Sequence, residues 1–147
     1  MQIWCSHYEP RCAYVSLDGP MVLFAYANHP HLAEGIPTID EYRSLPSFYF
    51  FGAGTRGEEF VKEFAAQIAD LMKNHGGWNR RLAVDRLSHI GCDALRETGL
   101  ELIEGEQITE TAWAVKSAEE LVLMQTSMNV CEASVQSMRE ALEPWNY

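Results

Sequence analysis

The second half of the chain alternates short apolar stretches with amphipathic helices, and this order limits the folds open to it. Residues 81–84 are expected to form a short buried strand and residues 100–103 a further strand. Helical periodicity covers residues 55–75 and 87–98. Strands that alternate with helices are typical of layered α/β folds. We therefore predict an α/β domain of three layers, in which a mixed β-sheet is flanked by helices.

The first half of the chain predicts further strands. Residues 11–17 and 21–26 flank an Asp-Gly turn, which is the usual signal of a β-hairpin. Both runs are nearly continuous in apolar residues, so we expect both faces of these strands to be covered. The proline-rich segment 27–47 has no helical period and is expected to be a long ordered loop or an edge excursion. Residues 48–51, Phe-Tyr-Phe-Phe, are expected to form an aromatic strand.

Two capping signals mark the starts of helices. Thr55 with Glu58, and Ser117 with Glu120, have the spacing of a capping box. The helix that follows Thr55 should bury one face against the sheet, because its apolar residues recur at helical spacing. That face comprises Phe60, Val61, Phe64, Ala65, Ile68, Leu71 and Met72.

The helix that follows Ser117 carries an apolar seam, whose members are separated alternately by three and four positions. The seam comprises Leu121, Met124, Met128, Cys131, Val135, Met138 and Leu142. This is the heptad pattern of helices that pack on another helix, and its methionines adapt to irregular surfaces. One interpretation is that the seam packs on this domain's own sheet. The helix is long for a small domain, which favours a seam that needs another chain or another domain.

Composition and charge exclude several classes of function. The net charge is −10 and no basic run is present, so we expect no binding to nucleic acid. No apolar stretch reaches the length that spans a bilayer, and the first residues do not form a signal peptide, so we expect no membrane association. The four cysteines lack the spacing of a zinc or redox motif, which favours a reduced, cytoplasmic protein.

The sequence contains none of the common catalytic motifs. One group has the density of metal-binding residue types that a metal site needs, and it is also explained as a polar loop. It comprises His29 and His31, with His7, Glu34 and Asp40 nearby in the sequence. Gly52 and Gly54 precede a helix and are explained either as an anion site or simply as the entry to that helix. We therefore expect no catalytic residue and no metal site in this chain.

The region from residue 79 to the last helix resembles the end of the creatinase/prolidase N-terminal domain. In that family a strand, a helix and a strand lead to a junction of the form R-x-x-K-S-x-x-E. Here residues 79–105 supply the strand, helix and strand, and Lys116, Ser117 and Glu120 match the junction. Trp113 stands where the family has its arginine.

The start of the chain is similar to one branch of this family. Residues 1–4, Met-Gln-Ile-Trp, together with His7 look closest to the dimethylsulfoniopropionate-lyase-like branch. The resemblance implies the ribonuclease-H-like motif of the creatinase N-terminal domain over residues 1–116, without the usual first helix and strand. It also implies that residues 117–147 form a long helix leading toward a catalytic domain. Trp4 and His7 would then lie at the edge of the substrate entrance.

The resemblance implies an accessory role for this chain. The metal ligands of the family would lie beyond Tyr147, so a divalent metal pair is expected in the catalytic domain alone. The parent enzyme would be a metal-dependent Xaa-Pro peptidase-like hydrolase, or a lyase in the branch named above. We expect a homodimer that also contacts the catalytic domain of the same parent chain and shapes its substrate entrance. The alternative is a stand-alone small-ligand-binding or scaffold protein that uses the aromatic strand at 48–51.

Overall fold

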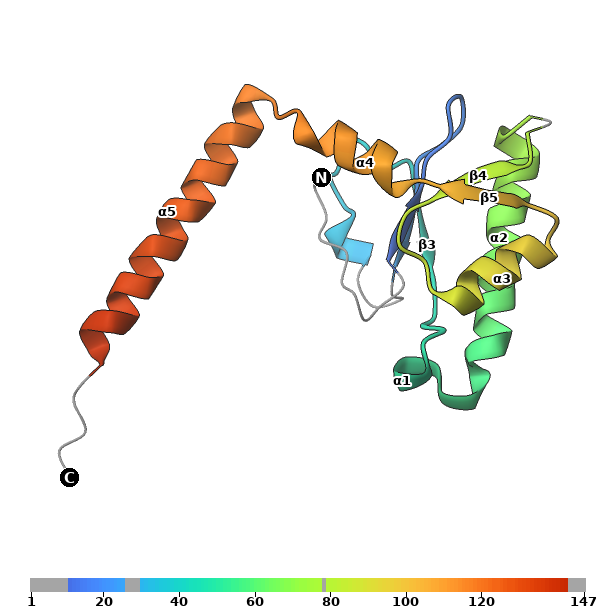
Figure 1. The fold of residues 1–147 in the computed structure, drawn as a ribbon, viewed down its shortest axis with the longest axis horizontal. Coiled ribbons are helices and arrows are strands. Elements are labelled where there is room, and N and C mark those ends of the chain that lie inside the picture. The colour runs from blue at the N-terminus through green and yellow to red at the C-terminus, as the bar shows by residue number, and fades with distance from the viewer. Residues whose placement is uncertain (1–10, 26–29, 78, 143–147) are drawn as a thin grey trace. The chain divides into compact units, whose positions relative to one another are not determined.

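The computed structural model describes residues 11–25, 30–77 and 79–142. Two compact units, residues 1–107 and 108–147, make up the chain, and each is described by itself. In the first unit the strands run in mixed directions and are flanked by helices (Figure 1), which confirms the predicted α/β class. The predicted domain boundary between Lys116 and Ser117 stays a prediction.

Three strands form the first sheet, in the order β1-β2-β3. The strands β1 (Cys12–Tyr14) and β2 (Val22–Ala25) pair antiparallel, with Ala13 opposite Leu23. This pairing confirms the predicted hairpin. The strand β3 (Glu41–Ser44) runs parallel to β2 and completes a mixed sheet.

The central strand β2 is covered on both faces, as predicted. All its side chains, from Val22 to Ala25, are at most 4% exposed. The prediction is wrong for β1, where Ala13 is exposed. The difference follows from position, because β1 is an edge strand and β2 is flanked by a strand on each side.

The strand β3 lies inside segment 27–47, which was expected to be a long ordered loop or an edge excursion, and β3 is an edge strand of the first sheet. It is held at its start by Asp40, whose Oδ2 accepts a hydrogen bond from the backbone N–H of Met21 at 2.8 Å. Its sequence, Glu-Tyr-Arg-Ser, shows no apolar alternation, so the usual signal of a strand is missing. Pairing with the buried strand β2 decides its conformation instead.

The predicted aromatic strand at 48–51 is wrong. Phe50 begins the short helix α1 (Phe50–Ala53), which is followed by a single turn of 3-10 helix (Gly54–Arg56). The carbonyl of Tyr49 accepts hydrogen bonds from the N–H groups of Gly52 and Ala53, at 3.0 and 2.9 Å, and these close the turn. Phe48 is buried, but Phe50 and Phe51 are exposed.

The helix α2 (Gly57–His75) buries the predicted apolar face, on which Phe60 is only partly buried. The predicted capping box at Thr55 is wrong, because the helix begins later and its N-cap is Arg56 with no side-chain cap. Arg56 instead donates to Glu59 at 3.0 Å. Acidic residues in the first turn also suit the positive end of the helix dipole.

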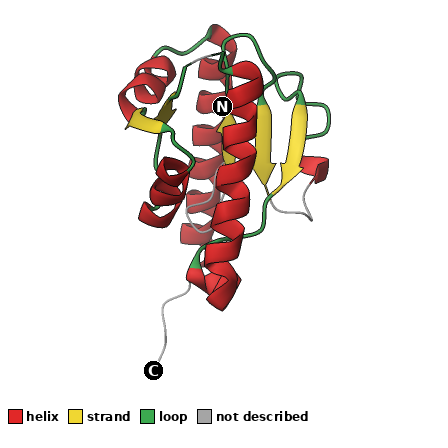
Figure 2. Cartoon of the chain, turned by 90° about the vertical axis from the view of Figure 1, so that its right-hand side faces the viewer, coloured by secondary structure: helices red, strands yellow, loops and turns green. Residues whose placement is uncertain are grey.

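The core forms where α2 meets the first sheet. The ring of Phe64 lies edge-on to Phe24 of β2, with centroids 5.8 Å apart, and stacks on Phe48 at 5.5 Å. On another side of α2 packs α3 (His89–Glu97), which buries Ala94 and Leu95. Figure 2 shows these helices in red beside the strands in yellow.

A second sheet contains two parallel strands, β4 (Arg81–Val84) and β5 (Glu101–Glu104), with Leu82 opposite Leu102. Both strands occur where the sequence predicts them. The expectation that residues 81–84 are buried is wrong, since Arg81 and Ala83 are exposed and only the alternate residues pack on the core. In the described residues, these strands pair with each other rather than with the first sheet.

The second unit is helical. Its helix α5 (Ala118–Ala141) begins after α4 (Glu106–Ala114), which starts at the boundary between the units. The predicted capping box is confirmed, because the N–H of Ser117 donates to Glu120 at 2.8 Å and the N–H of Glu120 donates to Ser117 Oγ at 3.2 Å. Proline ends helices, so the sequence also predicts that Pro144 stops this helix, and that residue lies outside the described residues.

Replacement of Phe64 tests the aromatic core. We expect Phe64→Ala to lower the free energy of unfolding by about 3–5 kcal/mol, because it removes a buried ring and leaves a cavity. Phe50→Ala is the matched control, since it makes the same chemical change at an exposed position, and it should change the stability little. Urea denaturation of both variants measures the difference, and equal losses would contradict this description of the core.

Candidate functional site

The structure leaves several predicted site residues undescribed. Trp4, His7 and His29 lie outside the described residues, so their predicted roles stay predictions. Within residues 11–25, 30–77 and 79–142, no group of three or more His, Cys, Asp or Glu side chains is placed to share a metal ion. His31 lies exposed in a single turn of 3-10 helix (Pro30–Leu32).

The seam of α5 faces solvent along its whole length. All seven seam residues are exposed, and the six other than Cys131 keep more than half of their surface accessible. No described residue of α5 is buried. The structure therefore presents the predicted seam as one continuous surface of a helix, and its partner stays a prediction.

The other faces of α5 are also short of charge. Val122, Leu123 and Val130 lie off the seam and are more than half exposed as well. Between Glu120 and Arg139 the sequence contains one charged residue, Glu132. A helix that is largely uncharged around its circumference is typical of a helix buried on several sides. One partner helix on the seam would leave much of this apolar surface uncovered.

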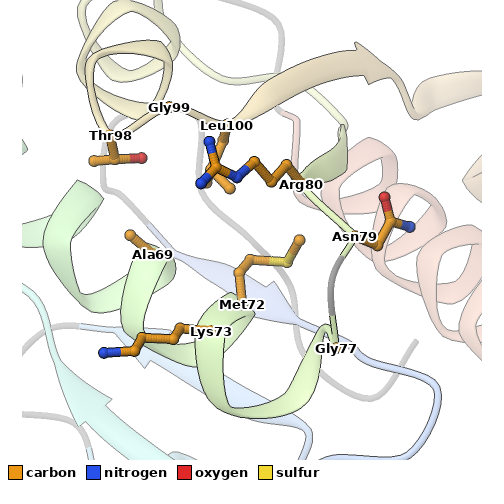
Figure 3. Close-up of a pocket in the computed structure, with 9 residues that line it drawn as sticks. All are labelled: Ala69, Met72, Lys73, Gly77, Asn79, Arg80, Thr98, Gly99 and Leu100. Atoms are coloured by element: carbon orange, nitrogen blue, oxygen red, sulfur yellow. The ribbon is translucent and has the colours of Figure 1, made fainter.

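A hollow of about 690 Å³ lies in the first unit near the ends of α2 and α3 (Figure 3). Its apolar lining includes Met72 and Leu100, and its polar lining includes Lys73, Asn79 and Arg80. The guanidinium group of Arg80 reaches over Gly99, where an added Cβ would lie 3.7 Å from Nη1. Sequence reasoning missed this hollow, because its lining comes from separate elements with no common motif.

The polar groups of the hollow are explained by the helix ends beside them. Thr98 caps α3 and donates its hydroxyl hydrogen to the carbonyl of Leu95 at 2.7 Å. The side-chain oxygen of Asn79 accepts from the N–H of Arg81 at 3.0 Å. Lys73 lies in the last turn of α2, where a positive charge offsets the negative end of the helix dipole. The residues that line this hollow include no nucleophile paired with a base.

The turn of the hairpin is fixed against the end of α2. Tyr14 is buried and its hydroxyl donates to Met72 Sδ at 3.6 Å. Burial raises the pKa of Tyr14 above its ordinary value of about 10, and the nearby Ser16 hydroxyl opposes that shift. A Cβ added at Gly19 would lie 2.6 Å from His75 Cβ. Only glycine therefore fits at this position, where the turn approaches the end of α2. We therefore assign Tyr14, Gly19 and His75 a role in holding the hairpin against α2.

The first unit is thus an α/β domain, and the second contains a long helix in which no described residue is buried. Comparison with profiles of known protein families gives no match. The chain is 35% identical over 150 residues, 99% of its length, to dimethylsulfoniopropionate lyase DddP of Roseovarius nubinhibens. It is 34% identical over 140 residues, 95% of its length, to the lyase of the same name from Roseobacter denitrificans.

These matches cover 34% and 31% of the two lyases, so the chain spans about one third of the length of the curated relatives. Both relatives are dimethylsulfoniopropionate lyases by name. The predicted similarity to the dimethylsulfoniopropionate-lyase-like branch is therefore confirmed. The creatinase-type N-terminal domain stays a prediction. In the described part of the chain, no helix has both the length and the apolar character to cross a bilayer.

The buried hydroxyl of Tyr14 predicts a loss of stability at alkaline pH. A raised pKa means that the unfolded chain releases this proton first. The contribution of Tyr14 is therefore complete below about pH 10 and is lost as the pH rises through the pKa of the folded state. Urea denaturation between about pH 8 and pH 11 should show a smaller alkaline loss for Tyr14→Phe than for the wild type.

The matched control for this experiment is Tyr49→Phe, which removes a hydroxyl from a partly buried tyrosine outside the hairpin. It measures how much of any change follows from the loss of a tyrosine hydroxyl as such. An unchanged alkaline loss in Tyr14→Phe would show that ionisation of Tyr14 is not linked to folding.

Proposed function

We propose that this chain is the N-terminal accessory region of a larger dimethylsulfoniopropionate-lyase-like enzyme of the pita-bread class. Its role is oligomerisation and shaping of the substrate entrance, and bond cleavage takes place in the rest of the enzyme. One observation carries this proposal: the similarity extends over 99% of this chain but over only 34% of the lyase. The divalent metal pair of such an enzyme belongs to that remaining region.

The surface of α5 supports a large partner. A two-stranded contact along the seam would leave Val122, Leu123 and Val130 in water. Burial of one such side chain contributes about 1.5–3 kcal/mol, so coverage on several sides is strongly favourable. The remaining region of the same polypeptide has the size to provide that coverage. We therefore assign the seam to contacts between domains, with subunit contacts formed beside it.

The names of the relatives favour a lyase over the Xaa-Pro peptidase that the broader family also suggests. Trp4 and His7 remain our candidates for the substrate edge, supported by the similarity at the start of the chain. The alternative function, a ligand-binding protein, relied on an aromatic strand at 48–51. That strand does not form, and Phe48 is part of the core.

The reaction is tested with the whole polypeptide encoded by the reading frame that contains this sequence. We expect the purified polypeptide, loaded with divalent metal, to consume dimethylsulfoniopropionate, and we expect the 147-residue chain alone to be inactive. Proton NMR follows the substrate directly, with an Xaa-Pro dipeptide as the comparison substrate. A polypeptide that cleaves the dipeptide and leaves dimethylsulfoniopropionate intact would overturn the assignment to the lyase branch.

Association is tested with the 147-residue chain, in which the seam of α5 is exposed. Large exposed apolar surfaces drive association, so light scattering at tens of micromolar should give a dimer. Met128→Lys places a charge in the seam and should give a monomer. Ala133→Lys adds the same charge to α5 off the seam and should leave the dimer intact. A wild-type chain that is monomeric at this concentration would show that the exposed seam does not drive association of the isolated chain.

A further inference from the structure

Two adjacent aromatic side chains project from the first unit at α1. Phe50 is 81% exposed and Phe51 is 100% exposed, and we call this pair the aromatic knob. Single apolar residues on a surface are common, but two neighbouring phenylalanines almost fully in water are costly and are typical of a contact site. Neither the seam of α5 nor the hollow near Arg80 includes these two residues.

The knob stands on a rigid base. The carbonyl of Tyr49 accepts two hydrogen bonds that close α1, and the ring of Phe48 stacks on Tyr49 at 5.2 Å and on Phe64 of α2 at 5.5 Å. At Gly57 an added Cβ would lie 2.9 Å from the carbonyl oxygen of Phe48, so α2 begins in close contact with this base. Side chains on a preformed base lose little further conformational entropy when they dock.

The shape and charge of the region indicate a protein partner. Small ligands bind in concave pockets, whereas both rings of the knob project into solvent. An anionic lipid surface would be repelled by the net charge of −10 and by Glu58, which follows the knob at the start of α2. Rigid aromatic side chains that fill a pocket are the usual anchors of protein interfaces.

We propose that the aromatic knob inserts into an apolar pocket on the remaining region of the same polypeptide. A symmetric contact between two copies through the knob would bury about 300–500 Å² on each side, because one aromatic side chain buries about 150–250 Å². A stable interface between separate molecules needs about 800 Å² per partner. Within one polypeptide the linker raises the effective concentration to the millimolar range, so a small anchor is sufficient.

The inference rests on the proposed function, since the relatives extend over about three times the length of this chain. Hydroxyl-radical footprinting with mass spectrometry tests it at the level of side chains. The oxidation rates of Phe50 and Phe51 are compared between the 147-residue chain and the whole polypeptide. We expect both rates to fall several-fold in the whole polypeptide. Leu17, which is 97% exposed, is the internal control and should react equally in both.

Equal oxidation of the knob in both samples would overturn the inference. Protection that disappears on dilution of the whole polypeptide would also overturn it, because the pocket would then belong to a second copy. As a second measurement, the double change Phe50→Ser and Phe51→Ser should lower the melting temperature of the whole polypeptide, while Leu17→Ser should not. The footprint does not depend on catalysis, so it can fail while the lyase assay succeeds, and the reverse.

Discussion

Phe64 is a residue of α2, and the packing of its ring against Phe24 and Phe48 is the contact on which the rest of the first unit depends. Its ring meets Phe24 of the central strand on one side and Phe48 on another. One side chain thus joins the first sheet, the long helix and the base of α1. Because Phe48 is held there, the chain must turn outward directly afterward, and Phe50 and Phe51 face water. The core and the aromatic knob are therefore two consequences of the same packing.

The second unit depends on a different balance. No described residue of α5 is buried. The helix is therefore stabilised by interactions within it, such as the reciprocal hydrogen bonds of Ser117 and Glu120. Local terms stabilise a helix weakly, and most helical stability in proteins comes from packing of an apolar face. The seam and the uncharged sides of α5 are what such packing requires. If α5 contacts the rest of a larger enzyme, as we propose, both the seam and the uncharged sides are accounted for.

Prediction from sequence succeeded where local signals and burial agree. The face of α2 and the capping box at Ser117 followed from residue spacing. The same spacing at Thr55 did not give a capping box, because α2 begins later than expected. Prediction failed at 48–51, since four consecutive aromatic residues look the same in a strand and around a helix start. It also failed at β3, whose polar sequence forms a strand only because β2 lies beside it. No sequence motif marks the hollow beside Arg80, because residues that are far apart in the sequence line it.

We propose that this chain works as part of a larger enzyme. The most direct measurement is the intact mass of the native protein, captured from its host with an antibody raised against this domain. A species about three times the length of this chain, as in the curated relatives, is the predicted result. A native species of 16.7 kDa would contradict the claim, and α5 would then need a separate partner.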